Sequence, residues 1–154
     1  MRTVIGDERA NPGRADATMD KNALSYEDGR IIGDGATLQV GLGRVPNEML
    51  RFIGERGGLR IHSDLLTEPI VDLLAQGVVS GPIVGSLAMG TRRLYDLLDD
   101  NPDARLEPIE HVCDPAALAR LPALASVTQA FTIDLAGQVC TERLDGALYG
   151  GVAT

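Results

Sequence analysis

The sequence has few of the residues that build disulfide frameworks or metal sites, and it has no long apolar run that could span a membrane. Its 154 residues include only two cysteines and two histidines. Cys113 and Cys140 lack both the C-x-x-C spacing of many zinc sites and the larger cysteine sets of disulfide scaffolds. No run of about 18 apolar residues and no N-terminal signal-peptide pattern is present. We therefore expect a cytoplasmic protein with reduced thiols, no membrane association and no metal site.

The charge of the chain argues against nucleic acid as a partner. The formal net charge is −8 at pH 7, and the basic residues are scattered. Proteins that bind nucleic acid through its phosphates usually present a basic stripe instead. With 44% hydrophobic and 23% charged residues, the composition is that of an ordinary globular protein, and 154 residues is the length of one domain.

The pattern of residues divides the chain into a short lead-in and one domain. Residues 1–15 are polar and show no periodicity, so they predict an irregular segment. A helix is predicted over residues 16–32, ending at the turn Gly33-Asp34-Gly35. We therefore expect a single domain over residues 16–154.

Beyond this turn, short apolar runs alternate with stretches of helical periodicity. Strands are predicted over residues 36–40, 59–62, 82–89 and 106–112, and helices over 46–55, 67–75, 91–98 and after Asp114-Pro115. Two further β-rich runs, 127–135 and 138–142, flank Ala136-Gly137 as in a hairpin. Strands separated by helices predict an α/β fold, with a mainly parallel sheet flanked by helices. The terminal hairpin is expected to add an antiparallel edge.

Two loops of this predicted sheet carry the residues best suited to chemistry. Ligands of parallel sheets bind at the carboxyl ends of the strands, where we expect Gly41-Leu42-Gly43 and His62-Ser63-Asp64. The backbone N–H groups of a Gly-x-Gly turn suit a phosphate or a developing oxyanion. The loop lacks the further residues of the dinucleotide and P-loop motifs, so a simple tight turn fits its spacing as well.

The polar side chains of these segments have both catalytic and structural interpretations. Asp64 can be a nucleophile, a general base or a cap for the next helix, and capping is the usual role. His62, a lone histidine beside a strand, is more often packed or hydrogen-bonded than catalytic. Asp134 and Gln138 flank the hairpin turn and are expected to serve it structurally.

Four segments, taken in order, resemble a known enzyme family. They read DGATLQVGLGRVPNEML, GLRIHSDLLTEPIVDLLAQGVV, RRLYDLLDDNP and AFTIDLAGQV. Between Ala15 and Gly151 the chain resembles the C-terminal half of acetyl-CoA hydrolases and of the related acetate and 4-hydroxybutyrate CoA-transferases. The resemblance implies a CoA-transferase-like fold and an enzyme that moves coenzyme A between carboxylic acids or hydrolyses acetyl-CoA.

The resemblance also implies a mechanism and its residues. In the family, a glutamate after an Ile-His-Ser/Thr run attacks the acyl-CoA thioester, and an enzyme-bound CoA thioester follows. Asp64 takes that position here, so it is the implied nucleophile. The amides of Leu42 and Gly43 are the implied oxyanion donors, and Gly41 and Gly151 are further candidates for oxyanion or CoA binding. The implied partners are an acyl-CoA and a small carboxylic acid, with no resident cofactor.

Departures from the family pattern support an alternative function. Asp64 is one methylene shorter than glutamate, which withdraws the carboxylate by roughly 1.5 Å. Ala153-Thr154 replaces a Gly-Gly pair, and Cys113 and Thr128 replace asparagines. A non-catalytic CoA-binding module, or an inactive fragment of such an enzyme, is therefore the second hypothesis. Because the family's members are longer, we expect truncation at the C-terminal end and a missing N-terminal domain as partner; homo-oligomerisation stays open.

Overall fold

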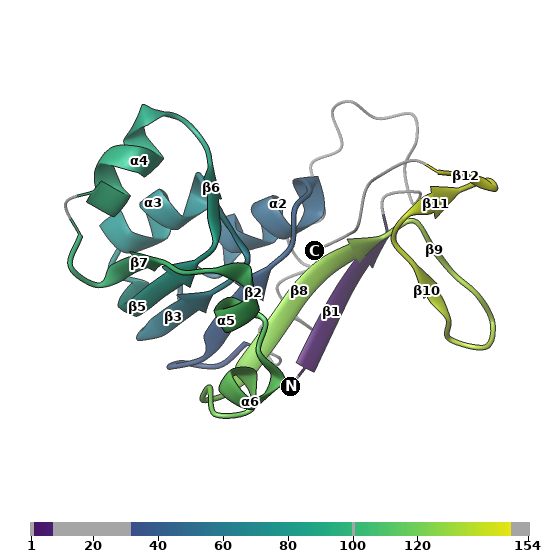
Figure 1. Cartoon of the computed structure of the whole chain (residues 1–154), viewed down its shortest axis with the longest axis horizontal. Helices are drawn as coiled ribbons and strands as arrows, with labels where there is room; N and C mark the ends of the chain where they lie inside the picture. Colours follow the sequence, from purple (N-terminus) through teal and green to yellow (C-terminus); the bar gives the residue numbers. More distant parts are fainter. Residues whose placement is uncertain (1, 8–31, 100, 149–154) are drawn as a thin grey trace.

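The fold is built on a parallel sheet in which strands and helices alternate, as the sequence predicts. The computed structural model describes residues 2–7, 32–99 and 101–148. Its main sheet has six strands in the order β1-β8-β2-β3-β5-β7, and every neighbouring pair is parallel. The strands are β1 (Arg2–Asp7), β2 (Thr37–Val40), β3 (Leu59–His62), β5 (Val79–Gly85), β7 (Ala104–Leu106) and β8 (Leu124–Ala130) (Figure 1).

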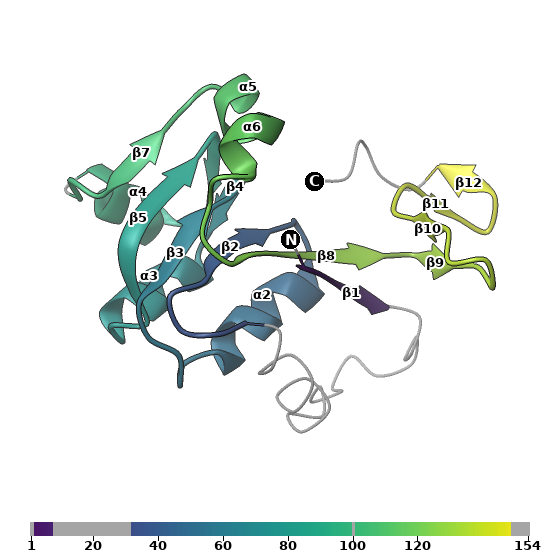
Figure 2. The same cartoon turned by 90° about the horizontal axis from the view of Figure 1, so that it is seen from below.

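Helices lie on both sides of this sheet. Figures 1 and 2 show α2 and α3 on one side, with α5 and α6 on the other. The helices are α2 (Arg44–Phe52), α3 (Pro69–Ala75), α4 (Arg92–Asp99), α5 (Ile109–Val112) and α6 (Pro115–Leu118). None of the helices in the described part of the chain is long and apolar enough to cross a membrane.

The hydrophobic core lies between the sheet and the helices α2 and α3. In β3, Leu59 and Ile61 are fully buried, whereas Arg60 and His62 are partly exposed. This alternation is the period of two that a strand requires when one face packs on the core. The helices contribute Met49, Leu50, Ile70 and Leu73 to the same cluster.

Residues 2–7 form a strand where the sequence predicted an irregular lead-in over 1–15. β1 pairs in parallel with β8, from Arg2 opposite Ala125 to Asp7 opposite Ala130. The prediction is wrong here because the strand depends on a partner far along the chain, which a short local pattern does not reveal. The helix predicted over 16–32 lies outside the described residues, except for Ile32, which is not helical.

The strand predicted over residues 106–112 is wrong over most of its length. β7 ends at Leu106, and α5 begins after Pro108, whose φ of −54° and ψ of 144° make it the N-cap. Proline has no N–H for a sheet and suits the start of a helix. The following turn closes with a hydrogen bond of 2.9 Å from Cys113 N to Ile109 O. The short helix predicted after Asp114-Pro115 is confirmed as α6.

The hairpin is confirmed, but its predicted place at the edge of the main sheet is wrong. β9 (Thr132–Ile133) and β10 (Val139–Cys140) pair antiparallel and form a sheet of their own. A second hairpin, of β11 (Arg143–Leu144) and β12 (Ala147–Leu148), follows it. β8 is an internal strand with β1 and β2 on its two sides, so the chain leaving it has no free edge to join. Figure 1 shows both hairpins beyond the end of β8.

The run predicted as one strand over residues 82–89 is divided at Ser86. β5 ends before it, and β6 (Leu87–Met89) pairs instead with β4 (Leu65–Thr67), outside the main sheet. The backbone N–H groups of Ser86 and Leu87 both donate to Asp64 O, at 3.1 and 2.9 Å. The chain segments after β3 and β5 therefore leave the sheet together, and Asp64 lies at the bend.

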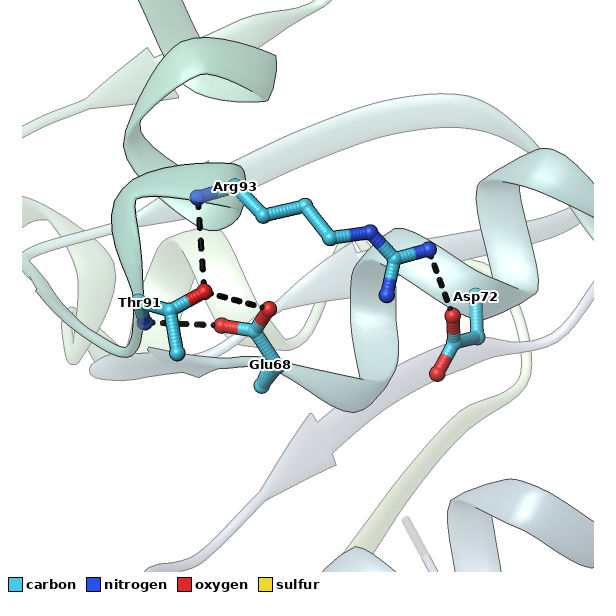
Figure 3. Close-up of polar contacts among 4 residues, drawn as sticks. All are labelled: Glu68, Asp72, Thr91 and Arg93. Atoms are coloured by element: carbon cyan, nitrogen blue, oxygen red, sulfur yellow. Dashed lines mark hydrogen bonds and ion pairs between the residues drawn. The ribbon is translucent and has the colours of Figure 1, made fainter.

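A polar clamp joins the start of α4 to α3 (Figure 3). The Glu68 carboxylate accepts hydrogen bonds from Thr91 N and Thr91 Oγ1, both at 2.8 Å. Arg93 Nη2 contacts Asp72 Oδ1 at 2.7 Å. Gly90 leaves room for this arrangement, since a Cβ there would lie 2.6 Å from Glu68 Oε2. The clamp is structural and lies on a surface of the molecule.

Candidate active site

The carboxyl ends of the parallel strands β8, β2, β3 and β5 lie along one edge of the sheet, which we call the carboxyl edge. Because these neighbouring strands are parallel, the loop Gly41-Leu42-Gly43 lies beside Ser63-Asp64 on one side and Gln129 on the other. Gly41 N donates to Val127 O at 2.8 Å, which continues the β2–β8 ladder into the loop. The two loops that the sequence singled out are therefore brought together, as predicted.

Ser63 connects the ends of β2 and β3 with its side chain. Its hydroxyl is fully buried and donates to Val40 O at 2.9 Å, while Val40 N donates back to Ser63 Oγ at 3.2 Å. Ser63 N donates in turn to Val84 O on β5. The residue before Asp64 is thus anchored to the strands on both sides, which holds Asp64 in a defined position.

Asp64 is a buried carboxylate, with 9% of its surface exposed. Its Oδ1 lies 3.4 Å from Ser63 Oγ, a long contact to a hydroxyl that is already bonded to Val40. The interpretation of Asp64 as a helix cap is wrong, because α3 begins only at Pro69, after Glu68. The carboxylate is therefore not committed to helix capping and lies where a parallel sheet binds ligands.

Cys113 and His62 complete the surroundings of Asp64. Burial raises the pKa of the Cys113 thiol, and the negative charge of Asp64 raises it further. His62 Nε2 donates to Val112 O at 2.8 Å, so the histidine holds α5 against β3. The packed interpretation of His62 is confirmed, and it orients the segment that carries Cys113.

Gln129 is a site residue that the sequence did not indicate. Its carboxamide packs directly on Gly43, where a Cβ would lie 2.0 Å from Gln129 Oε1. Gly43 has a φ of +146°, which residues with side chains rarely adopt. The only sequence signal was indirect, since the preceding Thr128 departs from the family pattern.

Two buried polar atoms at this edge have no hydrogen-bond partner. They are Gln129 Oε1 and Ser86 Oγ, and no other buried side-chain nitrogen or oxygen of the described residues is unpartnered. They lie on opposite sides of Asp64, on the strand ends of β8 and β5. Unsatisfied buried groups in folded proteins are rare, and a ligand that completes them is one physical explanation.

The other residues that the sequence analysis singled out lie in different surroundings in the structure. Leu42 is 51% exposed at the tip of its loop, and Gly41 is buried. Gly151 lies outside the described residues. Asp134 serves the hairpin turn as predicted, because its Oδ1 accepts from Ala136 N and Gln138 N, both at 2.8 Å. Within the described ranges, no group of three or more His, Cys, Asp and Glu residues is arranged to hold a metal ion.

A groove of about 790 Å³ opens beside Ser86, between α4 and β7. Leu87 and Leu106 form apolar walls and are more than half exposed, and Tyr95 and Arg105 also line the groove. Ser86 thus belongs both to the carboxyl edge and to the groove. The groove is therefore linked to Asp64 through Ser86, whose backbone N–H donates to Asp64 O.

Comparison with known proteins relates this chain to a group of enzymes. Residues 90–154 match the model of the acetyl-CoA hydrolase/transferase C-terminal domain. The 4-hydroxybutyrate coenzyme A transferase of Clostridium kluyveri is 31% identical over 140 residues, which cover 86% of this chain and 33% of that protein. The chain therefore spans about a third of the length of such curated relatives.

Solved structures show the same relationship. The crystal structure of RipA from Yersinia pestis has a TM-score of 0.78 at 30% identity, covering 89% of this chain and 33% of that one. The 4-hydroxybutyrate CoA-transferase of Porphyromonas gingivalis has a TM-score of 0.72 at 26% identity, covering 77% and 33%. The predicted α/β fold, with its mainly parallel sheet flanked by helices, is confirmed by these neighbours.

Proposed function

Since the chain belongs to the acetyl-CoA hydrolase/transferase family, we propose that the protein carrying it transfers coenzyme A from an acyl-CoA to a carboxylic acid or to water, through a covalent intermediate on Asp64. The observation that carries this proposal is the buried Asp64 carboxylate at the carboxyl edge, with the Gly-x-Gly loop on one side and the unpartnered Ser86 Oγ on the other. The whole reaction needs no resident cofactor, and we place it in the cytoplasm.

The proposed chemistry proceeds in balanced steps. An oxygen of Asp64 attacks the thioester carbonyl, and collapse of the tetrahedral intermediate expels CoA thiolate and leaves a mixed anhydride. The thiolate then attacks the Asp64 carbonyl, which releases the acyl group as a carboxylate and leaves Asp64 joined to CoA as a thioester. An acceptor carboxylate reverses the two steps to form the new acyl-CoA, whereas water releases free CoA.

The surroundings of Asp64 support two parts of this mechanism. The Gly43 N–H donates to no residue in the described part of the chain, so it can stabilise the oxyanion of the tetrahedral intermediate. The groove beside Ser86, which has both apolar and polar lining residues, suits the pantetheine arm of the acyl-CoA, in which methylene segments alternate with amides. Since the chain spans about a third of the length of the curated relatives, we propose that the surface that binds the carboxylic acid lies in a longer protein.

One observation favours the alternative of a CoA-binding module without turnover. Asp64 O is held by Ser86 N and Leu87 N, so the backbone is not free to advance the shorter carboxylate toward the thioester. A misplacement of about 1 Å can cost on the order of a hundredfold in rate. An Asp64→Glu variant that gains transferase activity, in a protein that otherwise only binds CoA, would support this alternative.

Chemical trapping on the full-length protein tests the proposed function. Acetyl-CoA is added together with hydroxylamine, which converts an enzyme anhydride or thioester into a hydroxamate, and peptides are analysed by mass spectrometry. We expect the modification on Asp64, its loss in Asp64→Asn, and its retention in Asp72→Asn, a matched aspartate in the exposed clamp. Turnover with an unmodified Asp64 would exclude this residue as the nucleophile. CoA binding by calorimetry without any adduct would instead favour the binding module.

A further inference from the structure

The carboxamide of Gln129 and the backbone of Gly43 form a close pair at the carboxyl edge. A Cβ at Gly43 would lie 2.0 Å from Gln129 Oε1, 2.3 Å from Cδ and 2.8 Å from Nε2. The whole amide group therefore occupies the space that a side chain at position 43 would fill. With a φ of +146°, Gly43 also holds a conformation in which only glycine is unstrained. The packing therefore requires glycine at position 43 and places the carboxamide of Gln129 against it.

Neither end of this carboxamide has a hydrogen-bond partner among the residues that the structure describes. Gln129 Oε1 is buried without a partner, and the Nε2 group donates to no described residue. A glutamine that served the fold would be expected to bond to a strand or a turn, as buried polar groups almost always do. An unpartnered buried oxygen costs free energy, so no hydrogen bond within the described residues explains why a glutamine occupies this position.

The distances allow Gly43 N and Gln129 Nε2 to act on one atom. Standard covalent geometry puts a backbone N about 2.5 Å from the Cβ of its own residue. Since that Cβ position is 2.8 Å from Gln129 Nε2, the two nitrogens are at most about 5.3 Å apart. Two donors that each lie about 2.9 Å from a shared oxygen can be up to about 5.8 Å apart. An oxygen between them can therefore accept from both.

We propose that Gln129 Nε2 is a second donor to the oxyanion formed when Asp64 attacks the thioester, acting beside the Gly43 N–H. The inference rests on the proposed function and adds a catalytic residue to it. Because the oxygen carries its full charge only in the tetrahedral intermediate, this donor stabilises the transition state more than the bound substrate. Asp64 is one methylene shorter than the family's glutamate, so the oxyanion is expected to form at a displaced position. A side-chain donor can adjust to that position by rotation of its own bonds, whereas a backbone N–H cannot.

The main test is the replacement of Gln129 by methionine, which has a similar length and no N–H donor. In the full-length protein, kcat for CoA transfer should fall on the order of a hundredfold with KM nearly unchanged. The thermal midpoint should rise at the same time, because the unpartnered Oε1 is removed. Gln138→Met is the matched control, since Gln138 is exposed on the hairpin turn, and it should change neither quantity.

A glutamate at position 129 supplies a signature that a merely structural role would not produce. The ionised carboxylate of Gln129→Glu repels an oxyanion, whereas its protonated form can donate a hydrogen bond. The ratio of the kcat of Gln129→Glu to that of the wild type should therefore rise as pH falls. Using the ratio removes the titration of Asp64, which affects both proteins.

The outcomes separate this inference from the proposed function. If the wild type forms the Asp64 adduct and Gln129→Met turns over at the wild-type rate, only the role of Gln129 is overturned. A higher kcat in Gln129→Met would show that the side chain blocks the Gly43 amide, and it would overturn the role as well. If the wild type forms no adduct, the proposed function fails and the role of Gln129 fails with it.

Discussion

The hydroxyl of Ser63 pairs with both backbone groups of Val40, donating to its C=O at 2.9 Å and accepting from its N–H at 3.2 Å. The regular pairing of β2 with β3 ends at Leu38 opposite Ile61, so a side chain continues the ladder where the backbone stops. This link holds the start of the Gly-x-Gly loop beside Asp64. Several measurable consequences depend on such contacts at the carboxyl edge.

Ser63→Ala is expected to lower the free energy of unfolding by about 2 kcal/mol. The substitution leaves the N–H and C=O of Val40 without partners in a buried position. Urea denaturation followed by circular dichroism measures the change. Ser80→Ala, at an exposed position in β5, is the control and should be nearly neutral. Equal midpoints for the two variants would show that the Ser63 link contributes little.

Gly43→Ala is expected to destabilise the protein by about 3 kcal/mol, because the new Cβ strains the backbone and overlaps the Gln129 carboxamide. In a Gln129→Ala background the overlap disappears and only the strain remains, so the cost should fall by about half. A double-mutant cycle by chemical denaturation measures this coupling. Gly57→Ala, where nothing lies near the added Cβ, is the control. Strictly additive effects would contradict the predicted overlap.

Alkylation should modify Cys140 before Cys113 as pH is raised. Backbone hydrogen bonds from residues 142 and 143 lower the pKa of the Cys140 thiol, whereas burial and then the Asp64 charge raise that of Cys113. A lower pKa means more thiolate at a given pH, and the thiolate is the reactive form. Iodoacetamide labelling from pH 7 to pH 10, with peptide mass spectrometry, gives the two profiles. The reverse order would contradict the prediction.

Asp64→Asn should move the Cys113 labelling profile toward lower pH. Removing the carboxylate charge removes one of the two causes that raise the pKa of this thiol, and burial remains as the other. Asp99→Asn, on the exposed surface of α4, is the control and should leave the profile in place. An unchanged profile in Asp64→Asn would show that Asp64 exerts no effect on Cys113.

Glu68→Ala should cost about 1 to 2 kcal/mol of stability, because the carboxylate accepts both hydrogen bonds that hold Thr91 at the start of α4. Asp72→Ala removes the neighbouring ion pair with Arg93, which is about half exposed, and should cost less than about 0.5 kcal/mol. Thermal and urea denaturation of both variants distinguish the two halves of the clamp. A larger loss of stability in Asp72→Ala than in Glu68→Ala would contradict the prediction that the Glu68 hydrogen bonds contribute more than the ion pair.

Much of the carboxyl edge could be predicted from local pattern. Residues 59–62 were predicted as a strand and form β3, and the strand expected over 36–40 forms β2 from Thr37. Alternating buried and exposed residues, followed by glycine or by an acid, mark where such strands end. Because parallel strands place their carboxyl ends together, the meeting of the Gly-x-Gly loop with Asp64 followed from the alternation alone.

The parts that escaped prediction all depend on partners distant in the sequence. β1 exists through its pairing with β8, and the hairpin stands apart because β8 is already paired on both sides. Gln129 on β8 contacts Gly43 at the end of the neighbouring strand β2, and nothing in the residues around either position indicates that contact.

The sequence by itself therefore determined the order of strands and helices and which residues lie at strand ends, because these follow from periodicity and turn chemistry within a few residues. Only the tertiary structure decided that Asp64 is held by Ser63, Ser86 and Leu87, and that Gln129 covers the Gly43 backbone. The physical reason is that a local pattern constrains backbone conformation, whereas the surroundings of a carboxylate depend on which strands pack side by side.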